Sequence, residues 1–136
     1  MNQTYLAAAA VVALLVLVFA TNFLLRRKPR KLNQTYYQAR WQTLQGLLKE
    51  KATWPLAIID ADKLLDDALK KSHYRGKTMG ERLMSAQREI KNNDEVWFGH
   101  KLRNQLVHEE QVKLTERKVK DALIGIRGAL KDLGAL

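Results

Sequence analysis

The chain lacks cysteine altogether, which excludes disulfides and thiolate metal sites and gives no reason to expect an oxidising compartment. Histidine is also scarce, with only His73, His100 and His108, and this leaves little for a histidine metal site. His100 and His108 are too far apart in sequence for the usual pair of metal ligands on one helix, which are about four residues apart. We therefore expect neither a metal nor another cofactor.

Several other signatures are missing. The sequence shows no alternating strand pattern, no internal repeat and no low-complexity linker. It has no glycine-rich phosphate loop and no serine or cysteine nucleophile motif. What it has is an uncharged N-terminal stretch followed by amphipathic segments, and this pattern predicts an all-α protein.

The uncharged stretch is Leu6–Leu25, rich in Ala, Val and Leu. A helix of this length is about 30 Å long, enough to cross the hydrocarbon core of a bilayer. A cleaved signal peptide is the alternative, and Val18–Ala20 resembles a cleavage site. A signal peptide needs positive charge before the apolar run, however, and Met1–Tyr5 has no Lys or Arg. The sequence therefore favours a single transmembrane helix.

Positive charge is concentrated directly after this stretch. The chain carries 24 Lys and Arg against 14 Asp and Glu, for a net charge of +10, and no acid precedes Glu50. Five of the basic residues form one run: Arg26, Arg27, Lys28, Arg30 and Lys31. By the positive-inside rule, the N-terminus lies outside the cell membrane and residues 26–136 lie in the cytoplasm. The run could also bind anionic lipids, but its role in topology is enough to explain it.

Three regions follow from this pattern. Residues 1–25 form the N-terminal segment with its transmembrane helix, 26–32 a basic juxtamembrane linker, and 33–136 an antiparallel bundle of about five helices. We expect those helices at about 33–51, 55–71, 78–90, 94–109 and 115–133. Helical spacing of apolar residues predicts these core positions: Tyr37, Trp41, Leu44, Leu48, Ala57, Ile58, Ala61, Leu64, Leu65, Ala68, Met79, Leu83, Ala86, Ile90, Val119, Ala122, Leu123, Ile126, Leu130 and Leu133.

Two helix starts carry capping signals. Thr78 and Glu81 match a capping box, in which each side chain accepts a hydrogen bond from a backbone N–H. The run Asn92–Glu95 offers a second cap, with acidic residues at the positive end of the helix that follows.

The fourth helix differs from the others because two of its faces are expected to pack against protein rather than to contact solvent. Phe98, Leu102 and Leu106 form an apolar stripe that should meet the core. A second, adjoining face carries Trp97, His100, Arg103, Asn104, Val107 and His108, which leaves Lys101 and Gln105 to solvent. His100, Asn104 and His108 form one row at four-residue spacing. A second face of this kind predicts a partner surface, and a homodimer is the natural candidate.

This helix also carries the one group of residues in the sequence whose types suggest catalysis. Residues 100–109 read H-K-L-R-N-Q-L-V-H-E, with Arg103 and Asn104 ahead of His108. The pattern resembles the signature of HEPN helical domains, many of which are metal-independent endoribonucleases. The resemblance implies that two protomers bring their motifs together in one composite site. His108 would then handle the proton of an RNA 2′-hydroxyl or of the leaving 5′-oxygen, Arg103 would hold the scissile phosphate, and Asn104 would orient both, supported by His100.

The chemistry of these residue types is compatible with that role. Histidine titrates near neutrality and acts as base or acid, and guanidinium offers a planar charged fork for phosphoryl oxygens. Arg103 and His108 lie about 140° apart around one helix, however. We therefore expect the site to need a second chain or fraying of the helix at His108. The chain departs from HEPN toxins, which are usually soluble and often paired with a nucleotidyltransferase.

A structural interpretation of the same residues stands beside the catalytic one. Arg103 can pair with Asp60 or Asp62 of the second bundle helix, and His108 can interact with the negative end of its own helix. The acidic residues of the second helix are Asp60, Asp62, Asp66 and Asp67. With Lys63, Lys70 and Lys71 nearby, we expect a solvated, ion-paired face there rather than a cation site at Asp62 and Asp66.

Three functions are therefore open. The first is a membrane-tethered, HEPN-like endoribonuclease that acts on RNA as a dimer through Arg103, Asn104 and His108. The second is a non-catalytic adaptor, in which the same anchored bundle binds another protein or its own copy. The third is a bundle that binds nucleic acid without cleaving it.

Overall fold

The computed structural model describes residues 2–25 and 31–136. In these two ranges all regular secondary structure is helical, with six α-helices and no strand. The prediction of an all-α protein with one N-terminal apolar helix is confirmed to this extent.

The N-terminal helix α1 (Gln3–Leu24) consists of uncharged residues and buries none of them. It is long and apolar enough to cross a membrane, with a mean hydropathy of 2.5. Its bounds agree with the predicted segment to within three residues. The predicted basic linker lies mostly at residues 26–30, outside the described residues. Lys31 is exposed, whereas Leu32 is buried in the core, so the packed part of the chain begins there.

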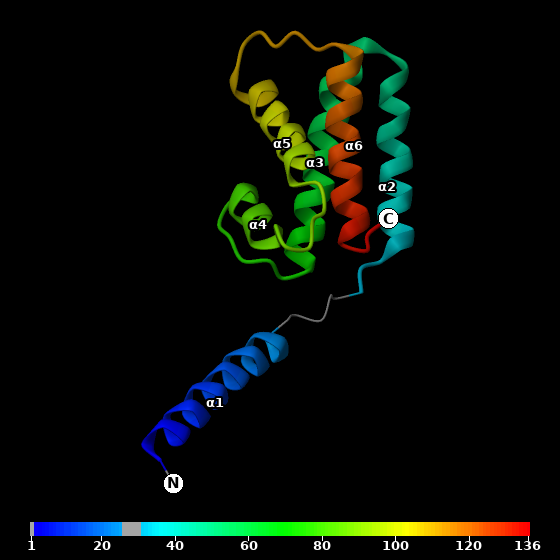
Figure 1. Ribbon diagram of the computed structural model, residues 1–136. Helices are drawn as coiled ribbons and strands as arrows, with labels where there is room; N and C mark the ends of the chain where they lie inside the picture. Colours follow the sequence, from blue (N-terminus) through cyan, green and yellow to red (C-terminus); the bar gives the residue numbers. More distant parts are fainter. Residues whose placement is uncertain (1, 26–30) are drawn as a thin grey trace.

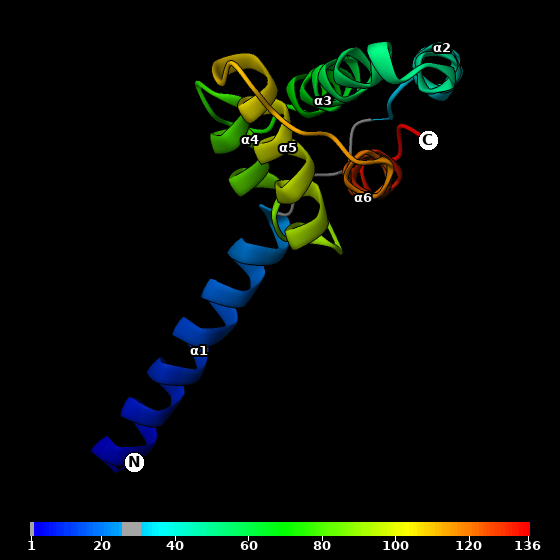
Figure 2. The ribbon, with the colours of Figure 1, turned by 90° about the horizontal axis from the view of Figure 1, so that it is seen from above.

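The remaining elements form one bundle (Figure 1). They are α2 (Gln34–Gly46), the 3-10 helices η1 (Leu47–Lys49) and η2 (Lys51–Thr53), α3 (Trp54–Lys71), α4 (Met79–Ala86), α5 (Asn93–His108) and α6 (Glu116–Asp132). Helices α2 and α3 run in opposite directions, as do α5 and α6. Helix α3 contacts α2, α4, α5 and α6. Seen from above, it lies between α2 at one edge and α4 at the other (Figure 2).

Short polar side chains begin most of these helices, although not all as predicted. Thr78 Oγ1 accepts from the Glu81 N–H at 3.2 Å, and Thr115 Oγ1 accepts from the Lys118 N–H at 3.3 Å. The Glu81 carboxylate accepts from the Lys77 N–H, so the capping box reaches one residue further back than expected. Of the signal predicted in the run Asn92–Glu95, the acids Asp94 and Glu95 do lie in the first turn of α5, but Asn92 at the cap position makes no side-chain capping bond. The neighbouring Asn93 amide instead donates to two loop carbonyls.

Most of the predicted core is confirmed. Leu48 and Met79 are only partly buried, because they lie at the edge where their helices leave the core. The buried hydrophobic residues are Leu32, Tyr37, Trp41, Leu44, Ala57, Ile58, Ala61, Leu64, Leu65, Ala68, Leu69, Leu83, Ala86, Ile90, Val96, Leu102, Val119, Ala122, Leu123, Ile126, Ala129, Leu130, Leu133 and Ala135.

The predicted inner face of α5 is wrong in part. Phe98 is 40% exposed and Leu106 is only partly buried, whereas Val96, Gly99, His100 and Leu102 are buried. The reason is that α5 rests on α6 through Gly99, which has no side chain, and the apolar pattern does not count glycine as a contact. The buried face is therefore centred near Gly99 and His100, and Phe98 turns outward.

Helices α5 and α6 approach each other very closely. A Cβ at Gly125 would lie 2.3 Å from the Glu95 carbonyl oxygen, and one at Gly99 would lie 2.9 Å from the Ala122 carbonyl oxygen. Any side chain at these positions would force the two backbones apart. The two glycines therefore set the position of α5, the helix with the Arg–Asn–His motif.

Gly125→Ala tests this contact. We expect a loss of about 2–4 kcal/mol in the free energy of unfolding, because the added methyl group meets backbone that cannot move aside. Urea denaturation of the full chain in detergent measures the loss. Gly128→Ala on the same helix is the matched control, since a Cβ there meets nothing within 4 Å. We expect it to stabilise by about 0.5–1 kcal/mol. Equal effects of the two substitutions would contradict the close contact.

Candidate functional site

An open cavity of about 580 Å³ lies where α3, α5 and the start of α4 meet. Three residues of the α5 motif line it: His100, Arg103 and Asn104. Asp62 of α3 lies opposite them, and Lys63 and Lys70 line the same space. Two further groups, Thr78 and Gly80, come from the first turn of α4.

Four side chains in this cavity form a closed ring of polar contacts. His100 Nδ1 lies 3.0 Å from Asp62 Oδ1, and Arg103 Nε lies 3.6 Å from Asp62 Oδ2. Arg103 Nη1 donates to Asn104 Oδ1 at 3.0 Å, and Asn104 Nδ2 lies 3.3 Å from His100 Nε2. Each residue of the ring therefore contacts two others, and Asp62 joins α3 to α5.

The ring assigns the protons of His100. A guanidinium can only donate, so the Asn104 oxygen must face Arg103 and the Asn104 NH₂ must face His100. His100 Nε2 is then the acceptor, and its Nδ1 carries the proton that is donated to Asp62. The ring thus fixes the orientation of the His100 imidazole between its two neighbours.

Asp62 is the most buried charged group of the site. Only 3% of its surface is exposed, and this burial raises the pKa of its carboxyl above the ordinary value. The hydrogen bond from His100 and the positive charge of Arg103 act against the rise. A buried carboxylate costs free energy unless it is paired, so the two α5 side chains compensate for a charge that the fold places in its interior.

The pairing of Arg103 with Asp62 was one of the predicted alternatives, and the structure shows it. The prediction of a solvated face is wrong for Asp62, because this residue lies on the buried side of α3 between Ile58 and Leu65. A signal for this was available, since Asp62 follows Ile58 and precedes Leu65 at helical spacing in the predicted apolar stripe. The i,i+4 pairs that were expected do form, between Asp66 and Lys70 at 2.8 Å and between Asp67 and Lys71 at 3.0 Å.

One ion pair beside the site was missed entirely. Arg82 of α4 is buried and binds Asp66 with both Nε and Nη2, at 2.7 and 3.1 Å. Its Nη1 also donates to the Gly76 carbonyl oxygen. Burial by itself would raise the pKa of the Asp66 carboxyl. The bonds have the larger effect in the opposite direction, so the pKa is lowered. The pair holds α4 against α3 and so closes one wall of the cavity.

His108 is separate from these residues. It is the last residue of α5, is exposed, and does not line the cavity. Of the predicted row, His100 and Asn104 contact each other, whereas the His108 side chain makes no hydrogen bond among the described residues. One chain thus brings together Arg103, Asn104 and His100 and leaves His108 outside, as expected from the 140° between Arg103 and His108.

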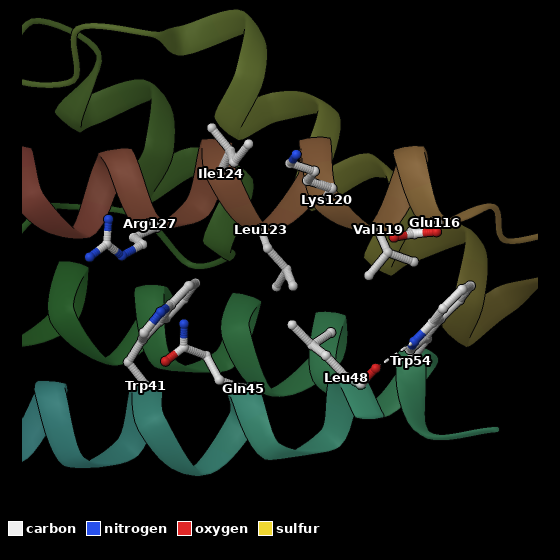
Figure 3. Close-up of a pocket in the computed structure, with 10 residues that line it drawn as sticks. All are labelled: Trp41, Gln45, Leu48, Trp54, Glu116, Val119, Lys120, Leu123, Ile124 and Arg127. Carbon is white, nitrogen blue, oxygen red and sulfur yellow. Dashed lines mark hydrogen bonds between the residues drawn. The ribbon is translucent and has the colours of Figure 1, made fainter. Parts of the chain in front are cut away.

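A second hollow lies on the other side of the bundle, between α2 and α6 (Figure 3). It measures about 320 Å³, and its walls are mainly apolar, with Trp41 and Trp54 toward its two ends and Leu123 between them. The Trp54 Nε1 donates to the Leu48 carbonyl oxygen at 3.1 Å. The charged residues Glu116, Lys120 and Arg127 lie on α6 along this groove. The groove offers apolar contact but no catalytic group.

The cavity of α3, α4 and α5 is thus the candidate functional site. Among the described residues, no group of three or more His, Cys, Asp or Glu side chains is placed to hold a metal ion. Comparisons with protein-family models, curated proteins and solved structures find no match to this chain. The chemistry of the site is therefore inferred from its residues and their geometry.

Asp62→Ala tests the ring. The substitution leaves buried His100 without an acceptor and Arg103 without a counter-charge, so we expect a loss of about 2–4 kcal/mol in the free energy of unfolding. Asp60→Ala, two residues earlier on α3, is the control. Asp60 has no hydrogen bond or ion pair among the described residues, so its loss should change stability by less than about 0.5 kcal/mol. A neutral effect of Asp62→Ala, measured by urea denaturation, would show that the ring adds nothing to the fold.

The lowered pKa of Asp66 predicts a pH dependence with a definite sign. Its ordinary pKa is 3.8, so its contribution is present above this value and disappears as the pH falls through the lower pKa of the folded state. Near pH 7, Asp66→Asn should cost about 2–4 kcal/mol. The difference from wild type should shrink as the pH falls below 3.8. Urea denaturation across this range measures it, with the exposed Asp121→Asn as control. A constant difference at all pH values would refute the assignment.

Proposed function

We propose that this chain is a membrane-anchored, HEPN-like ribonuclease. It cleaves cytoplasmic RNA without a metal, at a composite site formed by Arg103 of one copy and His108 of another. The observation that carries this proposal is the environment of the Arg103 side chain. A buried acid and an amide hold its guanidinium at an open cavity, and part of that guanidinium remains available to a ligand.

The geometry of Arg103 suits a phosphate. Its side chain is 33% exposed, with Nε directed to Asp62 and Nη1 bonded to Asn104. Among the described residues no hydrogen bond uses Nη2, so this nitrogen can donate to a phosphoryl oxygen. A guanidinium fixed on two sides needs little reorganisation when charge develops on the phosphate, which is how such a group lowers a barrier.

The cavity offers further positive charge. Lys63 and Lys70 line it together with Arg103. The acids there, Asp62 and Asp66, already have partners in His100, Arg103, Arg82 and Lys70. Lysines beside a scissile phosphate can contact the neighbouring phosphates of an RNA strand, and such contacts release counterions and favour binding.

His108 supplies the acid–base chemistry in this proposal. Its imidazole takes the proton of an RNA 2′-hydroxyl, whose oxygen then attacks the adjacent phosphorus. The bond from phosphorus to the 5′-oxygen breaks, and the protonated His108 gives its proton to that oxygen as the strand separates. The products are a 2′,3′-cyclic phosphate and a 5′-hydroxyl. The nucleophile comes from the RNA itself, so the protein needs only a base, an acid and stabilisation of the phosphate charge.

A second copy completes the site. Around α5, His108 points about 140° away from Arg103. The histidine that does line the cavity, His100, is engaged by Asp62 and Asn104, so one chain alone offers no unengaged histidine as a base there. A two-fold axis across the C-terminal half of α5 would place His108 of the partner subunit near each Arg103. Val107 supports such a contact, because it is apolar, 47% exposed and one turn beyond Arg103. Anchoring by α1 would confine the copies to one bilayer and raise their effective concentration.

A complementation assay tests the composite site. Full chain in detergent is incubated with structured and unstructured RNA in EDTA, and 2′,3′-cyclic phosphate ends are measured. Arg103→Ala and His108→Ala should each lower the rate by about 10²–10⁴-fold. Mixed in equal amounts, the two inactive variants should regain about a quarter of wild-type activity, because half of the dimers are mixed and each has one intact site. Lys101→Ala, on the outer face of α5, is the matched control.

Two results would count against this proposal. Activity that is lost in both variants and not regained on mixing would place Arg103 and His108 of one chain in the same site. No cleavage of any RNA, with a folded wild-type dimer present, would remove the ribonuclease.

A non-catalytic adaptor is the second candidate, and the groove of Figure 3 favours it. Two tryptophans and Leu123 form an apolar trough, and Ile124 is 51% exposed beside it. A trough between two helices is the usual receptor for one apolar helix face of a partner. In this candidate the ring of Asp62 only fixes α5 to α3. Absence of RNA cleavage would therefore leave the adaptor as the better function.

A further inference from the structure

The end of the bundle nearest to α1 has a distinct character. The start of α2 and the end of α3 lie together there (Figure 1). Leu32 is buried in the core, so the adjacent Lys31 is held at this end. The six peptide links from Leu25 to Lys31 span at most about 21 Å. If α1 crosses the bilayer, as the proposed function includes, this end must lie close to the lipid headgroups.

A cavity of about 510 Å³ opens at this end, and three lysines line it. Lys31 comes from the entry to α2, and Lys70 and Lys71 come from the last turn of α3. The side chains of Lys70 and Lys71 are 58% and 54% exposed, so solvent or a ligand can reach them. Three lysines, one from the segment before α2 and two from α3, therefore line one hollow.

The carboxylates nearby position these lysines without cancelling their charge. Asp66 contacts Lys70 but also binds Arg82, and Asp67 contacts Lys71 but also accepts from the Tyr37 hydroxyl at 2.8 Å. The four cations, Arg82 among them, exceed the two acids. Exposed ion pairs of this kind are weak, and an ammonium has three donors, so Lys70 and Lys71 can each bind a phosphate while keeping their aspartates.

Aromatic residues at the same place fit a headgroup region. Lys71 Nζ lies 4.8 Å from the centre of the Tyr36 ring and 5.7 Å from that of Tyr37. Tyr36 is 42% exposed and packs edge-on against Tyr37. Tyrosine is enriched at membrane interfaces, because its ring is apolar and its hydroxyl is hydrated.

We propose that Lys31, Lys70 and Lys71 bind the phosphates of anionic lipid headgroups and so hold the bundle against the bilayer. Each lysine near an anionic leaflet shifts the binding equilibrium by about fivefold. Docked in this way, the bundle keeps the loop between α5 and α6 at its far end, away from the membrane (Figure 1). The inference rests on the proposed anchoring by α1 but not on RNA cleavage.

The absence of cysteine makes a clean labelling experiment possible. Full chain with Gln34→Cys at the start of α2, or with Gln111→Cys in the far loop, carries one fluorescent dye. Each is reconstituted into nanodiscs that contain a nitroxide-headgroup lipid, in phosphatidylcholine with or without phosphatidylglycerol. We expect phosphatidylglycerol to increase quenching of the dye at position 34 by about twofold or more and to leave the dye at position 111 unchanged.

Variants identify the lysines that are responsible. Lys70→Gln/Lys71→Gln should abolish the increase in quenching that phosphatidylglycerol causes at position 34, and Lys70→Arg/Lys71→Arg should retain this increase. Lys118→Gln/Lys120→Gln on α6 removes the same charge elsewhere and should also retain it. Circular dichroism confirms that each variant is helical. In all of them the basic residues in the range 26–31, Lys31 included, are unchanged, so their attraction is common to every sample and the comparison isolates Lys70 and Lys71.

The outcomes separate docking from anchoring. Co-elution of protein and nanodiscs with equal quenching in both lipids would overturn the docking while leaving the anchor intact. An increase in quenching by phosphatidylglycerol that survives in Lys70→Gln/Lys71→Gln would also overturn the docking. Protein that fails to co-elute with the nanodiscs would refute the anchor, and the docking with it. Co-elution with a gain that needs Lys70 and Lys71 would establish the lipid site whether or not the protein cleaves RNA.

Discussion

The arrangement of the bundle depends on one buried carboxylate. Asp62 lies on the inner side of α3, where an unpaired charge would be costly, and its partners are His100 and Arg103 of α5. That pairing sets the rotation of α5 about its own axis. The contact of Gly99 and Gly125 with the facing backbones sets how close α5 lies to α6. Together, a polar constraint on one side and a steric one on the other leave α5 a single position.

The same constraint shapes the candidate site. Arg103 faces the cavity because Asp62 and Asn104 hold it, and Asn104 is oriented because His100 presents an acceptor to it. The residues that stabilise the α3–α5 contact are therefore the ones that would bind a phosphate. In the ribonuclease proposal this dual role keeps Arg103 preorganised. It also means that loss of activity in a ring variant has meaning only when its folding has been measured separately.

The bundle differs between its two ends and between its faces. Lys31, Lys70 and Lys71 lie where the chain arrives from α1, with Tyr36 and Tyr37 against Lys71. The loop between α5 and α6 lies at the opposite end (Figure 1). The polar cavity of α5 and the apolar groove of Figure 3 lie on different sides of the central helices. Lys70 lines both the polar cavity and the cavity of the three lysines, so a lipid and an RNA strand would share this residue, whereas a partner protein in the apolar groove would meet a separate surface.

Sequence by itself determined the class of the protein, the apolar N-terminal helix and nearly all of the core. Helical spacing, capping residues and the lack of charge at residues 6–25 are local properties, and they are decided within a few turns of chain. Tertiary structure alone decided which way α5 turns, because glycine leaves no mark in an apolar pattern and a helix can be rotated without changing its sequence. The separation of His108 from Arg103 also follows from the sequence, because the two residues lie about 140° apart around one helix. Tertiary structure decided which residues Asp62 meets. The spacing of Ile58, Asp62 and Leu65 places Asp62 on the inner side of α3, but that His100 and Arg103 are its partners depends on how two helices that are distant in sequence face each other.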